Sequence, residues 1–258
     1  MATYIGTDGS DTLVGTDNES DELIGKRGND ILIGGDDGFG FGFDFARYDS
    51  AISAVKVSLL SGTASGGDGN DTLLGIEGIA GSQFNDTLVG DENFNTLIGN
   101  KGNDVLIGGG GIDTADYTNA AAKVTVNLTL GTTSGGDGSD TLDSIESVIG
   151  SNFSDTLISG NDYEYHLFGG KGSDSLVSGK GFYNFLDGGE GNDTLIGSNE
   201  SNDNLIGGNG SDIITGGDGF GFDQVFYWGS SSAVVINLAN GTASGGEGND
   251  VLKGIEGI

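Results

Sequence analysis

The sequence has no cysteine and no proline, and it contains one histidine, one methionine and one tryptophan. Without cysteine there is no disulfide framework and no thiolate metal site, so sulfur says nothing of the redox compartment. One histidine is too few for a zinc centre built from histidine and cysteine. Apolar residues reach only 34%, which is too few for a thick two-layer core. We therefore expect a thin, linear interior.

Basic residues are also scarce. Lys and Arg number 9 against 39 Asp and Glu, which gives a net charge of −30 at pH 7. Nucleic acid is excluded as a partner, because its phosphates would meet a field of their own sign. A compact fold of this charge repels itself, so something positive has to offset it. The alternative is an acidic disordered chain, since low hydrophobicity with high net charge is the signature of disorder.

Long apolar runs are absent as well. No stretch approaches the roughly 20 apolar residues of a transmembrane helix, so we expect no transmembrane segment. The residues Met1 to Ser20 lack the basic and apolar segments of a cleaved signal peptide.

Glycine is abundant, with 53 residues, and it recurs at a period of nine. Residues 66–74 read G-G-D-G-N-D-T-L-L, and residues 188–196 read G-G-E-G-N-D-T-L-I. Further copies begin at Gly135, Gly169, Gly207 and Gly245, and looser ones at Gly6, Gly25, Gly81, Gly90, Gly99, Gly108 and Gly150. The pattern is G-G-x-G-x-D-x-U-x, where U is a large aliphatic residue. Such a strict period favours a solenoid over disorder when the right ion is present.

These copies closely resemble the RTX, or hemolysin-type, calcium-binding repeat family, and the resemblance covers nearly the whole chain. It implies an all-β fold, a right-handed parallel β-roll solenoid in which two nonapeptides make one turn. It also implies that calcium ions sit between successive turns.

The residues themselves support a roll. In T-L-L or T-L-I one inward side chain stands between two outward ones, which is the alternation of a short strand. The inward residues are predicted to stack into a ladder that forms the whole core: Leu13, Leu32, Leu73, Leu88, Leu97, Leu106, Leu142, Leu157, Leu176, Leu195, Leu205 and Leu252. Each ladder residue stabilises the fold by roughly 1.5–3 kcal/mol through burial.

The sixth position of the repeat carries the predicted metal ligands. Glycines let the loop turn with positive φ and bring carbonyl oxygens inward, and calcium takes six to eight oxygen ligands with tolerant geometry. Loops one turn apart should share an ion, as for Asp86 and Asp104, which are 18 residues apart. The predicted ligands are Asp11, Asp21, Asp30, Asp44, Asp71, Asp86, Asn95, Asp104, Asp113, Asp140, Asp155, Asp174, Asp193, Asp203, Asp212, Asp223 and Asp250.

Multiple Ca²⁺ ions are thus the expected cofactor. About a dozen ions would cancel most of the negative charge. We expect a chain that is unfolded at cytosolic calcium and folded at extracellular calcium, with dissociation constants of about 10⁻⁴ to 10⁻³ M.

A longer cassette is superimposed on the nonapeptides. Residues 44–79, 113–148 and 223–258 align without a gap, and each copy opens with D-x-[AV]-x-Y, as in Asp44, Ala46 and Tyr48. An alternating strand follows at residues 57–59, 126–128 and 236–238, and then come S-G-G-[DE]-G-x-D and I-E. In long RTX surface proteins a similar cassette looks like a roll turn with an extra strand. The predicted organisation is one roll over residues 1–258 with three inserted cassettes.

The two ends of the sequence match each other. Ile258 occupies the position of Ile79 in the first cassette, and residues 5–14 align with residues 80–89, which follow that cassette. This predicts head-to-tail self-association between the Ile258 end and the Tyr4–Ile5 end, a contact that does not close and so gives an open filament. The alternative is a piece cut from a longer repeat protein, and the sequence leaves both open.

Little in the sequence indicates catalysis. There is no G-x-S-x-G elbow and no P-loop, and we interpret His166 as surface decoration at an outward strand position, so the chain is expected not to be an enzyme. The stretch Phe39-Gly40-Phe41-Gly42-Phe43, echoed at residues 220–222, is interpreted as local packing. Carbohydrate stacking or contact between filaments is the alternative, because exposed aromatic residues mark binding surfaces.

Two functions follow as expectations. The first is a secreted, extracellular or cell-surface structural protein that builds a fibre, surface layer or adhesin stalk. The second is the calcium-binding repeat portion of a larger secreted adhesin or enzyme, such as a protease, lipase or alginate epimerase, since such enzymes in the family carry similar repeats.

Overall fold

The computed structural model describes residues 1–35, 42–161 and 164–258, and these residues form 28 β-strands. No described segment is a helix long and apolar enough to cross a membrane. The residues Phe39 to Phe41 of the predicted aromatic stretch lie outside the described part. The expected all-β class is confirmed.

The described residues form two compact units, each taken here by itself. The first unit comprises Met1–Asp116 and Asp137–Ile145, and the second comprises Tyr117–Gly136 and Glu146–Ile258. The organisation as one roll over residues 1–258 with three inserted cassettes stays a prediction.

The first unit has two sheets. One sheet is all parallel and consists, in spatial order, of β1 (Ala2–Ile5), β3 (Asp21–Ile24), β5 (Phe45–Arg47), β9 (Gly78–Ala80), β11 (Thr96–Ile98) and β13 (Thr114–Asp116). The other sheet consists of β2 (Thr12–Val14), β4 (Ile31–Ile33), β8 (Gly69–Leu74), β7 (Thr63–Gly66), β6 (Val55–Ser58), β10 (Thr87–Val89), β12 (Val105–Ile107) and β16 (Thr141–Asp143).

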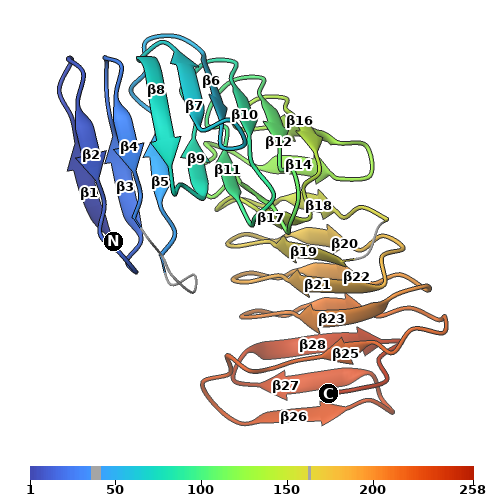
Figure 1. Cartoon of the computed structure of the whole chain (residues 1–258). Helices are drawn as coiled ribbons and strands as arrows, with labels where there is room; N and C mark the ends of the chain where they lie inside the picture. Colours follow the sequence, from blue (N-terminus) through green and yellow to red (C-terminus); the bar gives the residue numbers. More distant parts are fainter. Residues whose placement is uncertain (36–41, 162–163) are drawn as a thin grey trace. The chain divides into compact units, whose positions relative to one another are not determined.

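The second unit repeats this plan. Its fully parallel sheet consists of β17 (Ser147–Ile149), β19 (Glu164–Phe168), β21 (Tyr183–Asp187), β23 (Asn202–Ile206) and β25 (Gln224–Val225). Its other sheet consists of β15 (Thr132–Gly135), β14 (Val124–Asn127), β18 (Thr156–Ile158), β20 (Ser175–Val177), β22 (Thr194–Ile196), β24 (Ile213–Thr215), β28 (Gly248–Lys253), β27 (Thr242–Gly245) and β26 (Val234–Asn237). Strands of successive turns lie beside one another as rungs (Figure 1).

The core is the predicted leucine ladder. Leu176 lies directly beside Leu195 in the parallel register of β20 and β22, and both side chains are fully buried. All the predicted ladder leucines are buried except Leu13, which is half-buried on an edge strand. The parallel sheet adds inward residues such as Leu186. Three-residue strands suffice because each one needs only a single apolar residue facing inward.

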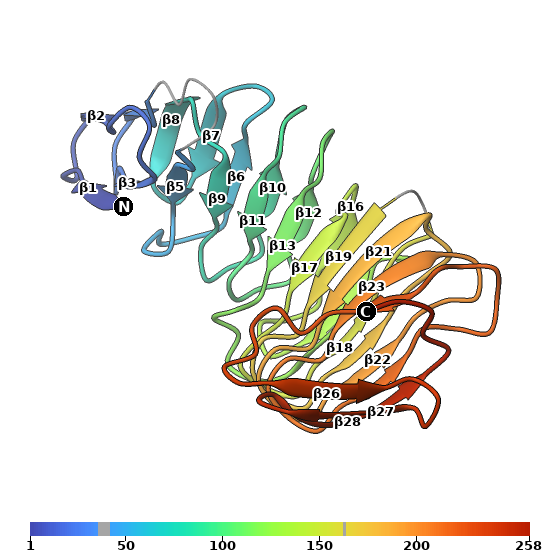
Figure 2. The same cartoon turned by 90° about the horizontal axis from the view of Figure 1, so that it is seen from below.

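The cassettes depart from purely parallel pairing. In the first cassette β7 lies between β6 and β8 and pairs antiparallel with both (Figure 2). In the third cassette β26, β27 and β28 form the same meander (Figure 1). The strand expected at residues 57–59 is β6, which begins at Val55 and ends at Ser58. Antiparallel neighbours can be joined by a short hairpin, whereas parallel neighbours need a crossover connection. The extra strands therefore add to one sheet without the chain passing through the other sheet in between.

Candidate metal centres

The glycine-rich loops place sixth-position aspartates above one another. In the second unit, Asp174, Asp193 and Asp212 immediately precede β20, β22 and β24, and each is at most 2% exposed. The Asp174 amide donates to Oδ1 of Asp193 at 2.7 Å, and the Asp193 amide donates to Oδ1 of Asp212 at 2.8 Å. One oxygen of each carboxylate therefore fixes the register between turns.

The other carboxylate oxygen has no hydrogen-bond partner. Oδ2 of Asp30, Asp104, Asp174, Asp193 and Asp212 is buried without a donor. At Gly188, the point where a Cβ would stand lies 2.5 Å from Oδ2 of Asp193 and 2.7 Å from the carbonyl oxygen of Gly207. A carboxylate oxygen and a carbonyl oxygen of the next loop thus converge beside one glycine. Burying such a carboxylate is costly unless a cation accompanies it.

Glycine is required at these loops by close backbone contact. Gly191 has φ +141°, and a Cβ there would overlap the carbonyl oxygen of Gly172 in the preceding loop. The loops also bond along their length, since the Glu190 amide donates to the Gly170 oxygen and the Gly172 amide donates to the Glu190 oxygen, both at 2.8 Å. A side chain at the third glycine would therefore separate the stacked loops.

The unpartnered carboxylates have raised pKa values. Burial, together with neighbouring aspartates, raises the pKa of Asp104, Asp174 and Asp212 to about 7 from an ordinary 3.8. Burial likewise raises the pKa of Asp193 to about 6. A bound divalent cation reverses this effect, because an adjacent opposite charge favours the ionised form.

A second group of predicted ligands is bonded to hydroxyl groups instead. The Ser151 hydroxyl donates to Oδ1 of Asp155 at 2.8 Å, and the Thr16 hydroxyl donates to Oδ2 of Asp21 at 2.9 Å. Asp11, Asp86 and Asp203 are bonded in the same way by Thr7, Ser82 and Ser201. In these loops a serine or threonine follows a single glycine or lies close before the aspartate. Each of these carboxylates therefore has a hydroxyl donor, which the Oδ2 atoms of Asp174, Asp193 and Asp212 lack.

In the cassettes, tyrosine serves this purpose. Tyr48 donates its hydroxyl to Oδ2 of Asp71 at 3.1 Å, and Tyr227 donates to Oδ2 of Asp250 at 2.9 Å. The tyrosine of D-x-[AV]-x-Y is therefore the partner of an aspartate 23 residues further on. The sequence showed the motif, but only the fold shows this contact.

Two glutamates of the cassettes, which were not among the predicted ligands, stand in the row of stacked aspartates. Oε2 of Glu77 accepts the Asp44 amide and Oε2 of Glu256 accepts the Asp223 amide, each at 2.9 Å. These glutamates hold the positions that aspartate holds in ordinary repeats. The I-E pair, which occurs in every cassette, was the available signal.

The remaining predicted ligands are buried at equivalent places. Oδ1 of Asn95 accepts the Asp91 amide at 2.7 Å, and the Asn95 amide donates to Oδ1 of Asp113 at 2.8 Å. The others of this set are Asp44, Asp140 and Asp223. The assignment of all these residues as calcium ligands stays a prediction.

The donor set fits calcium and excludes a cluster of side chains alone. In the part of the chain that the structure describes, no three aspartate, glutamate or histidine side chains converge on one point. An ion here has to combine one or two carboxylates with backbone carbonyl oxygens. Calcium accepts that mixture at variable coordination number, whereas transition metals prefer nitrogen or sulfur ligands.

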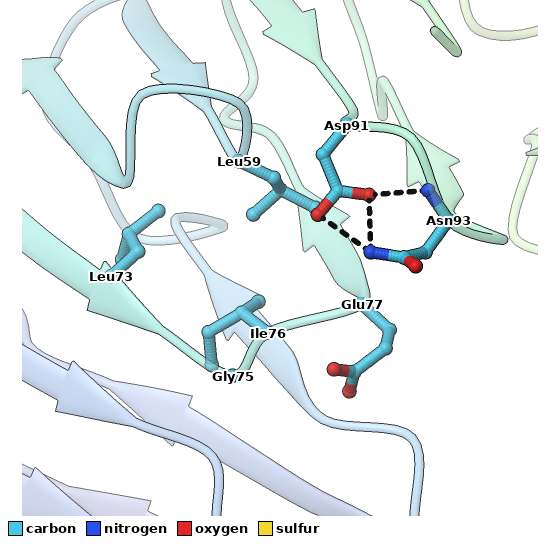
Figure 3. A pocket seen from close by; sticks show the side chains of 7 residues that line it. All are labelled: Leu59, Leu73, Gly75, Ile76, Glu77, Asp91 and Asn93. Carbon is cyan, nitrogen blue, oxygen red and sulfur yellow. Dashed lines mark hydrogen bonds between the residues drawn. The ribbon is translucent and has the colours of Figure 1, made fainter. Parts of the chain in front are cut away.

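A cavity in the first unit also contains acidic residues. It has a volume of about 280 Å³ and is lined by Leu59, Leu73, Gly75, Ile76, Glu77, Asp91 and Asn93 (Figure 3). Both oxygens of Asp91 accept hydrogen bonds from the Asn93 side chain, and Glu77 accepts the Asp44 amide. Both carboxylates in the cavity therefore have structural partners. His166, at an outward position on β19, contacts Glu164 at 3.1 Å.

The fold and the aspartate ladder define a calcium-binding β-roll. A family model described as the RTX calcium-binding nonapeptide repeat (4 copies) matches residues 16–37, 63–78, 81–115, 198–219 and 237–257. The chain therefore carries RTX calcium-binding repeats, which bind multiple Ca²⁺ ions, and the expected family and cofactor are confirmed. The matched ranges include Asp30, Asp104 and Asp212. No curated protein matches the chain.

The raised pKa values predict a pH response of the calcium-free chain. The folded-state pKa of Asp104, Asp174 and Asp212, about 7, exceeds the unfolded value, so the folded state binds protons more tightly. Its stability therefore falls as pH rises from about 4 to about 7. We expect circular dichroism in EGTA to show more β structure at pH 4 than at pH 8.

Calcium affinity should change in the opposite direction. The ion displaces protons from the same carboxylates, so the calcium midpoint should rise as pH falls from about 7 to about 5. A calcium-free chain whose β signal is the same throughout this range would show that these carboxylates do not titrate with folding.

Proposed function

We propose that the chain is an extracellular, calcium-dependent structural repeat protein without catalytic activity. The single observation that carries this proposal is the row of buried aspartates whose Oδ2 atoms have no partner. A chain with such a row and a net charge of −30 needs millimolar calcium to fold, and calcium of that concentration is found outside cells. The resemblance to RTX proteins, which are typically exported, supports the same location.

We further propose that copies associate head to tail. In the first cassette β6 pairs with β10 through Val57 and Leu88, whereas the equivalent strand β26 pairs only with β27 among the described strands. β26 thus presents an open edge, and Val235 on it is 68% exposed. Open parallel edges are templates for another chain.

The alignment of the repeats gives the expected register of this contact. Residues 235–237 correspond to residues 56–58, and residues 12–14 correspond to residues 87–89. The pairs between copies would be Val235 with Thr12, Ile236 with Leu13, and Asn237 with Val14. This packing would complete the burial of Leu13, the one ladder leucine that is half-buried.

Electron microscopy of the purified chain at 5 to 10 mM calcium, a range of about ten times the dissociation constant expected for extracellular sites, tests the proposal. We expect filaments that disappear in EGTA. A matched variant, Val234→Pro, changes the first residue of β26 and removes the amide that corresponds to the Val55 amide, which donates to Asp86 in the first cassette, so it should shorten the filaments without unfolding the roll. Uniform short rods from the wild-type chain would contradict assembly.

One observation favours the second function. The open edge of β26 would accept a following repeat of the same polypeptide equally well, as β6 accepts β10. The chain would then be the calcium-binding repeat portion of a larger secreted adhesin or enzyme.

The exposed side chains of Phe220, Phe222 and Trp228 support carbohydrate stacking or contact between filaments as a further role. Glycan binding by the wild-type chain and by Trp228→Ala would test that role.

A further inference from the structure

A second type of acidic site lies beside the aspartate row of the second unit. A cavity of about 330 Å³ borders the stacked glycine loops. Its lining includes the acidic residues Asp187, Glu190 and Glu247 and the glycines Gly170, Gly189 and Gly208. None of these side chains occupies the sixth position of a repeat.

Glu247 is the unusual member of this cavity. It is 7% exposed, and its Oε2 is buried with no hydrogen-bond partner. It stands at the third position of its loop, where Lys171 and Glu190 of the ordinary repeats leave their side chains about 60% exposed. A buried carboxylate oxygen without a donor costs free energy unless a cation compensates it.

The same position is buried in the first unit. Asp68, third in the loop of the first cassette, is 4% exposed, and its Oδ2 also lacks a partner. Arg27 lies close enough to Asp68 to favour its ionised form. In the second unit, Asn209 occupies the place of that arginine, because the Gly210 amide bonds to the Glu247 carbonyl as the Gly28 amide bonds to that of Asp68. Glu247 therefore has no such neutralising neighbour.

Asp187 faces the same cavity from the end of β21. It lies on the outward side of its strand, next to the inward Leu186. Burial raises the pKa of Asp187. The pKa of Glu247 is raised mainly by burial, then by Asp250 and then by Asp187. Lys171 pairs with Glu190 at 3.1 Å on the exposed surface. The lining residues thus supply negative charge and no cationic side chain.

We propose that Asp187 and Glu247 together bind a divalent cation of the calcium type, with carbonyl oxygens of the cavity's glycines completing its coordination. This site is separate from the sixth-position aspartates and does not depend on the proposed location or assembly. It joins residues of three successive turns, since Asp187 ends β21, Gly208 follows β23 and Glu247 precedes β28. The cation would therefore attach the third cassette to the repeats before it.

Counting the bound ions tests this site. Equilibrium dialysis of the full chain with Ca²⁺, followed by atomic emission spectrometry, gives the number of ions per chain. We expect Glu247→Gln and Asp187→Asn each to bind one ion fewer than the wild type, and the double variant to bind one fewer and not two. Glu190→Gln is the matched control and should bind the wild-type number. Equal ion counts in all variants would overturn the proposal.

A measurement on the wild type avoids any folding defect in the variants. The anomalous signal of crystals grown with calcium should show a peak between Asp187 and Glu247. A calcium-loaded crystal with peaks at Asp174, Asp193 and Asp212 but none at Glu247 would refute the site.

Terbium luminescence gives a further readout. Trp228, the single tryptophan, precedes Gly229, which lines the cavity. Tb³⁺ emission excited through Trp228 should fall in Glu247→Gln and persist in Glu190→Gln.

Discussion

Adding excess EGTA to the calcium-loaded chain is expected to abolish most of its β-sheet circular dichroism. The physical reason is that Oδ2 of Asp104, Asp174 and Asp212 is buried without a donor, and removal of the ion leaves these charges uncompensated in a chain of net charge −30. The thin leucine core cannot offset that repulsion. Calcium titrated back should restore the signal with a midpoint of about 10⁻⁴ to 10⁻³ M.

Magnesium is the matched control for this experiment. It demands near-octahedral geometry and releases its water reluctantly, so the same concentration should leave the chain unfolded. A β signal that is unchanged after chelation would show that the fold does not depend on the metal. The burial of the carboxylates would then have no explanation.

Replacing Asp193 by alanine should have the largest effect of any single aspartate substitution. Asp193 lies between the loops of Asp174 and Asp212. Its loss therefore removes a ligand from the ion position on each side of its loop. It also removes the acceptor of the buried Asp174 amide, which costs about 1–3 kcal/mol. We expect about two fewer bound ions and a calcium midpoint raised at least tenfold. Dialysis and circular dichroism measure both quantities.

Asp155→Ala is the comparison that separates metal binding from hydrogen bonding. Asp155 also accepts a backbone amide, that of Val124 at 2.7 Å, but its second oxygen is bonded to Ser151. Its replacement should destabilise the fold by about 1–3 kcal/mol through the lost hydrogen bonds while the ion count stays unchanged. If both variants lose the same number of ions, the division of the aspartates by their hydroxyl partners is wrong.

The core could be read from the sequence because strand geometry is local. Side chains of a strand alternate, so T-L-I identifies its inward residue without knowledge of its neighbours. Leu176, Leu195 and Leu205 are fully buried as predicted. The nine-residue period then forces equivalent residues of successive turns into register. Leu13 is half-buried because the strand that carries it pairs on only one side among the described strands.

The ligand state of each aspartate could be read only in part. The pattern placed all of them on the inner side of the loops, but it did not separate Asp193, with an unpartnered oxygen, from Asp155, bonded to Ser151. A local signal existed, since G-G-x-G precedes Asp193 and G-S-x-x-x precedes Asp155. The tyrosine partners carried no such signal, because 23 residues separate Tyr48 from Asp71.

By itself, the sequence determined the roll, its leucine ladder and its calcium-binding repeats, because these depend on a short period, on side-chain alternation and on charge. The tertiary structure alone decided the antiparallel strands of the cassettes, the tyrosine contacts and the burial of Glu247. Each of these depends on which distant loop lies beside which, and backbone packing between turns sets that proximity.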